Sequence, residues 1–169
     1  MRPVSSLGKT AYYVAPLVLW MAFIYGASTD AGSADHTRPL VGSILRRLLP
    51  SVAEHLSPEA VDRVDWNVRK AAHITEYALL AVLAYRAVAF GHARFRSRNV
   101  VLPFVIAVAY AASDEYHQSF TASRGAAAAD VTFDTFGVTI GLILCLWQRL
   151  AASEAMNAKR AAPTTATKT

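Results

Sequence analysis

The stretch Tyr110–Gly141, YAASDEYHQSFTASRGAAAADVTFDTFGVTIG, sets a cluster of polar and charged side chains between two apolar runs. Ionisable groups inside a membrane or at its edge are energetically costly, and proteins tend to keep them for a function. We therefore expect a functional site in this stretch, at the edge of an apolar fold. The polar members of the stretch are Asp114, Glu115, His117, Gln118, Arg124, Asp130 and Asp134.

The composition of the whole chain is that of a membrane protein. Of its 169 residues, 54% are hydrophobic and only 17% are charged, which is too apolar for most soluble domains of this length. The net charge of +5 would suit nucleic acid, but the basic residues flank apolar segments and form no basic run with interleaved aromatics. Nucleic acid is therefore not an expected partner. The single cysteine, Cys145, has no intrachain disulfide partner and is interpreted as a small buried apolar residue.

Four apolar runs predict an all-α fold, an integral membrane four-helix bundle with spans at about residues 11–27, 70–90, 99–116 and 131–148. The runs and their connections make one domain of residues 1–150, and residues 151–169 are predicted to be a disordered cytoplasmic tail. A signal peptide is the rival interpretation of the first run, because Arg2 and Lys9 precede it. No A-x-A cleavage pattern closes that run, so a retained span is preferred.

The connection between the first two runs is polar and is expected to hold short surface helices on the outer side. Leu40–Leu49 is an amphipathic segment, which is predicted to lie along the membrane surface. Ser57, Pro58 and Glu59 form a helix-start signal, so a second short helix leads directly into the span that begins at Lys70.

The distribution of basic residues predicts the orientation. The N-terminus, the connector at residues 86–98 and the residues from Arg149 onward hold ten of the seventeen Lys and Arg. By the positive-inside rule these segments are cytoplasmic, so the chain is a multi-pass protein of the inner (plasma) membrane with both termini inside. The first loop, the third loop and the polar cluster then face outward.

Polar side chains recur at helical spacing in three of the predicted spans, so each set occupies one helix face. The sets lie at the outer ends of their spans, with Arg124 in the short loop above them, and together they predict one outward-facing polar pocket. In the last span the face continues as a G-x-x-x-G pattern, which lets helix backbones approach closely. The three sets are Lys70, His73, Glu76 and Tyr77; Tyr110, Asp114, His117 and Gln118; and Asp130, Asp134, Gly137 and Gly141.

The combined pattern resembles the VanZ-like family of small membrane proteins. It consists of KxxHxxEY from Lys70, DExHQxF from Asp114, Arg124, and DVxxDxxGxxxG from Asp130, and the resemblance covers about Ser28 to Leu146. The family usually has Asn where this chain has Asp134, and often Pro-Gly in the turn before Arg124, where this chain has Thr-Ala-Ser. The resemblance implies a four-span protein associated with resistance to teicoplanin-type glycopeptides, and it implies no defined reaction.

Two chemistries suit the predicted pocket. In the metal-free one, catalytic residues His73, Glu76, Asp114 and His117 supply a general base and its orienting carboxylate. Lys70, Gln118, Arg124, Asp130 and Asp134 then bind the substrate. In the other, the same four catalytic candidates are ligands of a divalent metal such as zinc, although the familiar H-E-x-x-H pattern is absent.

A structural interpretation exists for each group. His73 with Glu76, or Asp114 with Arg124, would form a pair that only fixes helix packing, and Asp130 would cap the last helix. Three classes of function therefore stay open: an envelope hydrolase or transferase at the outer leaflet, a binding or shielding protein, and a structural or transport protein. The expected partners are the lipid bilayer and an amphipathic envelope component, either a lipid-linked substrate or a glycopeptide. The oligomeric state is left open.

Overall fold

The structure, a computed structural model, describes residues 6–29, 33–90, 97–120 and 128–161, and within these ranges it is all-α. The all-α class predicted from the sequence is therefore confirmed. Arg124 and the turn before it lie outside the described residues. The helices are α1 (Ser6–Ala27), α2 (Ala34–Leu48), α3 (Pro50–Ala53), α4 (Pro58–Ala89), α5 (Arg98–Gln118) and α6 (Ala128–Ala161).

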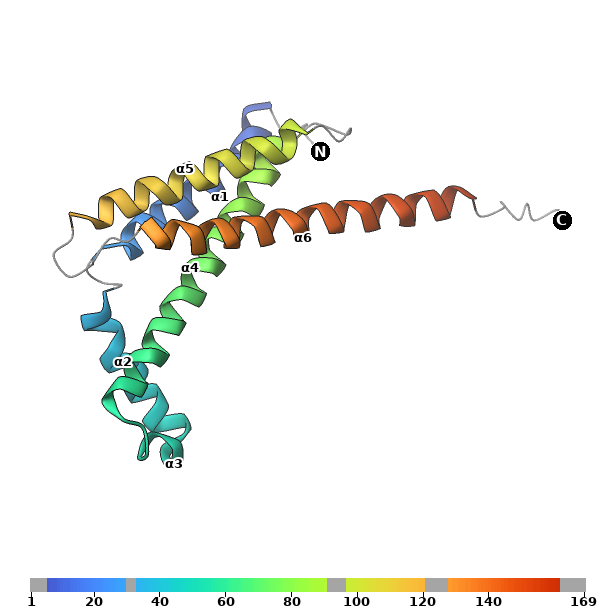
Figure 1. Ribbon diagram of the computed structural model, residues 1–169. Helices are drawn as coiled ribbons and strands as arrows, with labels where there is room; N and C mark the ends of the chain where they lie inside the picture. The colour runs from blue at the N-terminus through green and yellow to red at the C-terminus, as the bar shows by residue number, and fades with distance from the viewer. Residues whose placement is uncertain (1–5, 30–32, 91–96, 121–127, 162–169) are drawn as a thin grey trace.

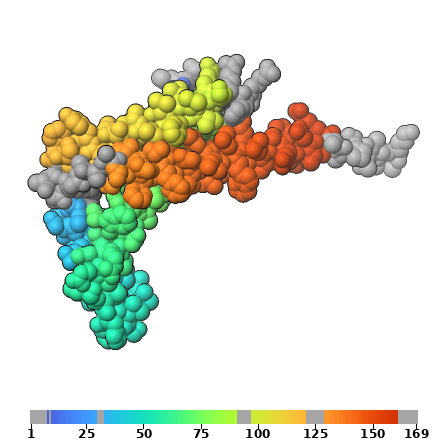
Figure 2. All heavy atoms as spheres, in the orientation of Figure 1, coloured from blue at the N-terminus to red at the C-terminus, as the bar shows by residue number. Residues whose placement is uncertain are grey.

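Helix α4 organises the molecule, because it packs against α1, α2, α5 and α6 (Figure 1). Its second half lies against α1, α5 and α6, while its first turns extend away from them toward α2 and α3 (Figures 1 and 2). The long helices α1, α4, α5 and α6 alternate in direction along the chain. The start of α1 and the end of α6 consequently lie toward the same end of the bundle (Figure 1).

Helix α4 is one continuous helix of 32 residues. At its start, the backbone N–H of Ala60 donates to the Ser57 hydroxyl over 3.3 Å, and Pro58 occupies a first-turn position where its missing N–H costs nothing. The Ser57 hydroxyl also hydrogen-bonds the Glu59 carboxylate and holds the pKa of that carboxyl below its usual value. The helix-start signal, and the direct passage from the short helix into the next apolar run, are therefore confirmed.

Helices α4 and α6 approach each other at two glycines. A Cβ added at Gly137 would stand 2.3 Å from the backbone oxygen of Ile74, and one at Gly141 would stand 2.3 Å from that of Ala78. No side chain fits at such a distance from a rigid helix backbone. The G-x-x-x-G pattern thus sets the close contact between α4 and α6. Nearer the start of α6, polar residues of the two helices make further contacts.

Two of the described helices are long and apolar enough to cross a membrane, over Thr10–Ala27 and Ala129–Arg160. Helices α4 and α5 are not among these two, and α5 carries the polar residues Asp114, Glu115 and Gln118 buried inside the bundle. Large apolar side chains instead cover the outside of the bundle, such as Leu19 and Phe23. The outer surface of the bundle therefore carries exposed apolar side chains.

The predicted disordered tail is wrong for its first part, because α6 continues as helix to Ala161. The sequence from Ala151 to Ala161, AASEAMNAKRA, consists mainly of strong helix formers and extends the preceding helix without a break. The side chains of residues 151–160 are all exposed to solvent. Intrinsic helix propensity rather than packing therefore accounts for this extension. Residues 162–169 lie outside the described residues.

Candidate functional site

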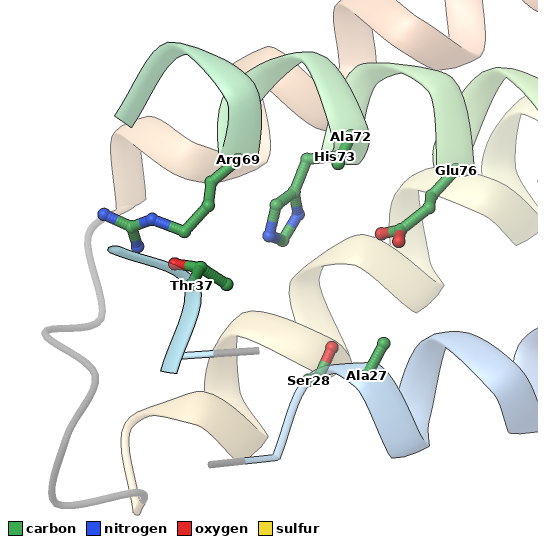
Figure 3. Close-up of a pocket in the computed structure, with 7 residues that line it drawn as sticks. All are labelled: Ala27, Ser28, Thr37, Arg69, Ala72, His73 and Glu76. Atoms are coloured by element: carbon green, nitrogen blue, oxygen red, sulfur yellow. The ribbon is translucent and has the colours of Figure 1, made fainter. Parts of the chain in front are cut away.

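A cavity of about 130 Å³ lies where the end of α1, the start of α2 and the middle of α4 meet (Figure 3). Helix α4 supplies Arg69, His73 and Glu76, which follow i, i+4, i+7 spacing and so share one face. Ser28 and Thr37 add two hydroxyls from the other two segments, and Ala27 and Ala72 complete the wall. Figure 3 shows the imidazole of His73 between the guanidinium of Arg69 and the carboxylate of Glu76.

Arg69 and the end of α1 are each held by a contact beside the cavity. The Arg69 Nε donates to Asp65 Oδ2 over 3.1 Å one turn earlier in α4, and Asp65 is only 2% exposed. The indole N–H of Trp20 donates to the backbone oxygen of Glu76 over 3.0 Å, which fixes α1 against the cavity wall. The cavity therefore has a positive group anchored at one side and a carboxylate at the other.

His73 connects the cavity to α6. Its Nδ1 lies 3.3 Å from Oδ1 of Asp134, at ion-pair distance but without the alignment of a hydrogen bond. Asp134 is 2% exposed, so a protonated His73 would have a charge partner shielded from water. The carboxylate of Asp134 thus lies beside an imidazole that can carry the opposite charge. This is the position at which the sequence departs from the Asn expected from the family resemblance.

Lys70 turns toward α6 instead of the cavity. Its Nζ lies 2.6 Å from Oδ1 of Asp130, and it lies 5.6 and 5.4 Å from the ring centres of Trp66 and Phe133. Asp130 lies inside α6, which already includes Ala128, so its carboxylate is an ion-pair partner and the cap interpretation is wrong. The ion pair between Lys70 and Asp130 ties α4 to α6 next to the contact between His73 and Asp134.

Asp114 is the centre of a buried hydrogen-bond network between α1, α4 and α5. Its Oδ2 accepts hydrogen bonds from Ser28 Oγ over 2.8 Å, from Tyr77 Oη over 3.2 Å and from Gln118 Nε2 over 2.8 Å. Asp114 is 4% exposed and Tyr77 is completely buried. Ser28 both lines the cavity and donates to Asp114, so the network reaches the cavity through one hydroxyl.

His117 and Tyr110 of α5 contact α1. The ring of His117 lies against that of Tyr25, with centroids 4.4 Å apart, and Tyr110 donates from its hydroxyl to the backbone oxygen of Met21 over 2.5 Å. His117 and Glu115 do not line the described cavity. The four catalytic candidates are consequently separated: His73 and Glu76 share the cavity, Asp114 lies behind it, and His117 packs on α1.

The metal interpretation gains no support from this arrangement. Within residues 6–29, 33–90, 97–120 and 128–161, no group of three or more His, Cys, Asp and Glu is placed to hold a metal ion. Arg124, predicted to bind substrate, lies outside these ranges.

Three polar residues of the cavity are absent from the set predicted from the sequence, namely Ser28, Thr37 and Arg69. Arg69 carried a usable signal, because it precedes His73 by one turn and shares its face more closely than Lys70 does. Ser28 and Thr37 carried none, since each is a single hydroxyl residue whose place depends on how α1 and α2 return to α4.

The chain combines an all-α fold, two helices that can span a bilayer, and a polar cluster enclosed by apolar helices, which is the pattern of a membrane protein. The sequence model of the VanZ/LLP1 family matches residues 13–149, from within α1 to within α6. The chain belongs to the VanZ/LLP1 family. This confirms the family assignment and extends it to the first helix. No curated protein and no solved structure gives a significant match.

Proposed function

We propose that this chain is a four-span protein of the plasma membrane whose outward-facing cavity binds the polar head of an amphipathic envelope component. The observation that carries the proposal is the cavity itself: Arg69, His73, Glu76 and two hydroxyls converge on a space of about 130 Å³ at the edge of an apolar bundle. A space of this size admits part of a headgroup, such as a phosphate or one end of a sugar, while the rest of the molecule stays in the lipid.

The four-span arrangement is supported by how α4 and α5 are packed. Their polar residues point into the bundle, where Asp114 is nearly inaccessible, while apolar residues such as Val101 and Val105 of α5 are exposed. Helices in lipid place polar side chains inside and apolar ones outside in this way. Because the four long helices alternate in direction, both termini lie on the same side of the membrane. The excess of Lys and Arg at the termini and in the connector at residues 86–98 makes that side cytoplasmic.

The cavity residues have distinct roles in this proposal. The Arg69 guanidinium, held by Asp65, recognises an anionic group of the ligand by paired hydrogen bonds. His73 and Glu76 bind neighbouring hydroxyls, and in an enzymatic version His73 would act as the general base at the outer leaflet. A lipid-linked sugar and a teicoplanin-type glycopeptide both offer an anionic or hydroxyl-rich head on a lipid chain. Membership of the VanZ/LLP1 family favours the link to glycopeptide resistance.

A second candidate function is structural, and the Asp114 network favours it. Three donors from Ser28, Tyr77 and Gln118 meet on one carboxylate oxygen, which is the arrangement expected of a group that locks helices together. In this alternative the polar cluster fixes helix packing and binds no ligand. Substitution of the cavity residues distinguishes the two candidate functions. If the structural one is correct, Arg69, His73 and Glu76 can be replaced without loss of function.

We expect the double variant His73→Ala/Glu76→Ala to lose the function of the chain while keeping its fold. In a susceptible bacterial host that expresses the chain, the inhibitory concentration of teicoplanin should fall to that of the host with an empty vector. The physical reason is that both side chains supply the polar wall of the cavity. The three donors to Asp114 are other residues, namely Ser28, Tyr77 and Gln118. The lipid and envelope-metabolite profile of the same strains should change with the phenotype if the bound component is turned over.

The matched control is Glu54→Ala/His55→Ala, which removes the same two side-chain types from the exposed end of α3. At equal membrane levels it should behave as the unmodified chain. Full protection by the His73→Ala/Glu76→Ala variant would contradict the cavity proposal. Absence of protection by the unmodified chain would contradict the glycopeptide link.

A further inference from the structure

A second cavity, of about 410 Å³, lies between α1, α4 and α6, near the C-terminal end of α4 and the first half of α1. Tyr13 contributes from α1, Arg86 and Phe90 from the end of α4, and Cys145 and Gln148 from α6. In the proposed membrane arrangement this end is cytoplasmic, opposite to the cavity that holds His73. The two cavities share no lining residue.

The lining of this cavity is divided into a polar and an apolar part. Arg86, Tyr85 and Gln148 supply hydrogen-bonding groups, whereas Val82, Ala89 and Phe90 supply apolar contacts. Among the described residues that line it, none is acidic. A molecule that fits both parts has an anionic or hydrogen-bonding head and an apolar body.

Arg86 is held in place by contacts that use only part of its N–H donors. Its guanidinium lies 4.7 and 5.1 Å from the ring centres of Tyr12 and Tyr13, and its Nη2 donates to the backbone oxygen of Tyr12 over 3.4 Å. A guanidinium has five N–H donors, so further donors can reach an anion in the cavity. Arg149 adds a second positive charge next to the cavity, where its Nη1 donates to the Tyr85 hydroxyl over 3.3 Å.

Aromatic side chains place this cavity at the level of a membrane interface. Tyr12 and Trp147 are 65% and 67% exposed, although both belong to apolar helices. Tyr and Trp concentrate where lipid headgroups meet the hydrocarbon, because one end of each side chain is apolar and the other is polar. A positive, partly apolar cavity between helices at this depth matches the headgroup of an anionic lipid.

We propose that this cavity binds an anionic glycerophospholipid from the adjoining leaflet, with the phosphate on Arg86 and an acyl chain along Val82 and Cys145. The inference shares with the proposed function only the membrane arrangement and concerns a separate site. The cytoplasmic leaflet is rich in anionic lipid, which favours the same occupant.

The single cysteine provides a probe inside the cavity, because Cys145 lines it and is 8% exposed. The rate at which N-ethylmaleimide alkylates Cys145 is measured on the purified full chain in detergent micelles. Added dioleoyl-phosphatidylglycerol should slow alkylation, while dioleoyl-phosphatidylcholine and soluble glycerol phosphate should not. Arg86→Gln should weaken the protection by phosphatidylglycerol about fivefold, since one basic side chain contributes about 1 kcal/mol to anionic-lipid binding.

Arg47→Gln is the matched control, because Arg47 is an exposed arginine on α2 away from this cavity, and it should keep full protection. Gln148→Glu is a second test at an exposed position that leaves Arg86 and its contacts in place. The added negative charge repels the phosphate and should also weaken the protection. Equal protection by both lipids, or full protection by phosphatidylglycerol in Arg86→Gln and Gln148→Glu, would overturn the proposal. Protection by glycerol phosphate alone would identify a free phosphate site instead of a lipid site.

Discussion

Gly137→Ala is expected to lower the free energy of unfolding by about 3 kcal/mol, at the upper end of the usual range for overpacking. The new methyl group would stand 2.3 Å from the carbonyl oxygen of Ile74, and the obstacle is helix backbone that no side-chain rotation can remove. The helices α4 and α6 must separate to accept it, which weakens the contacts that both share with α5. Unfolding of the purified chain in mixed micelles, followed by circular dichroism, measures the change.

Gly26→Ala is the control for the glycine prediction, because Gly26 is also helical but has no neighbour within 4 Å of an added Cβ. It should change the free energy of unfolding by less than about 1 kcal/mol and in the stabilising direction, since alanine is the better helix former. Equal effects of the two substitutions would show that the glycines act through helix propensity and not through close packing. The double variant Gly137→Ala/Gly141→Ala should fail to fold.

Asp114→Ala is expected to destabilise the chain by about 2–4 kcal/mol, because it leaves three donors from three segments without their acceptor. The donors are the hydroxyls of Ser28 and Tyr77 and the amide of Gln118, all buried. Asp114→Asn should cost less, since its amide oxygen can still accept. The same unfolding measurement in mixed micelles applies.

Ser113→Ala is the neighbouring control, because the exposed Ser113 hydroxyl donates only to the backbone of Tyr110 in its own helix. Its expected effect is within about 0.5 kcal/mol. If Asp114→Ala were as mild as Ser113→Ala, the network would not hold the helices together. If Asp114→Asn kept both stability and phenotype, a catalytic role for the Asp114 carboxylate would be contradicted.

The features that were predicted from the sequence are those set by local spacing. The start of α4 at Ser57 and Pro58 follows from a short capping motif. The facing of Gly137 and Gly141 toward another helix follows from their four-residue repeat. The pairing of Asp114 with Gln118 on one face of α5 follows from helical periodicity. Each of these depends on fewer than ten residues of contiguous sequence.

The features that were missed depend on how helices are oriented around each other. Lys70 and Arg69 are adjacent in sequence, yet one turns toward Asp130 of α6 and the other lines the cavity with Thr37 of α2. Helical spacing favours Arg69 over Lys70 as the neighbour of His73 on one face, but the partner of each residue on α2 or α6 depends on the packing of α4. His117 likewise packs its ring on Tyr25 of α1 and does not line the cavity that holds His73.

The two ends of the bundle have different proposed roles on one scaffold. The contact of α4 with α6 is fixed by glycine at its centre, by Lys70 and Asp130 toward one end, and by Tyr85 and Arg149 toward the other. These contacts hold the α4 wall of the cavity through residues that do not line the cavity. His73 and Glu76, which are not among the three donors to Asp114, can therefore be substituted to test function separately from that network.

The direction in which the cavity opens is tested most directly at Thr37, which lines it from α2. In a Cys145→Ala background, Thr37→Cys should react with an impermeant thiol reagent added to intact cells to the same extent as after lysis. Ser153→Cys, at the exposed end of α6, should react only after lysis. Reaction of Thr37→Cys only after lysis would place the cavity on the cytoplasmic side and contradict the proposal that it receives an outer envelope component.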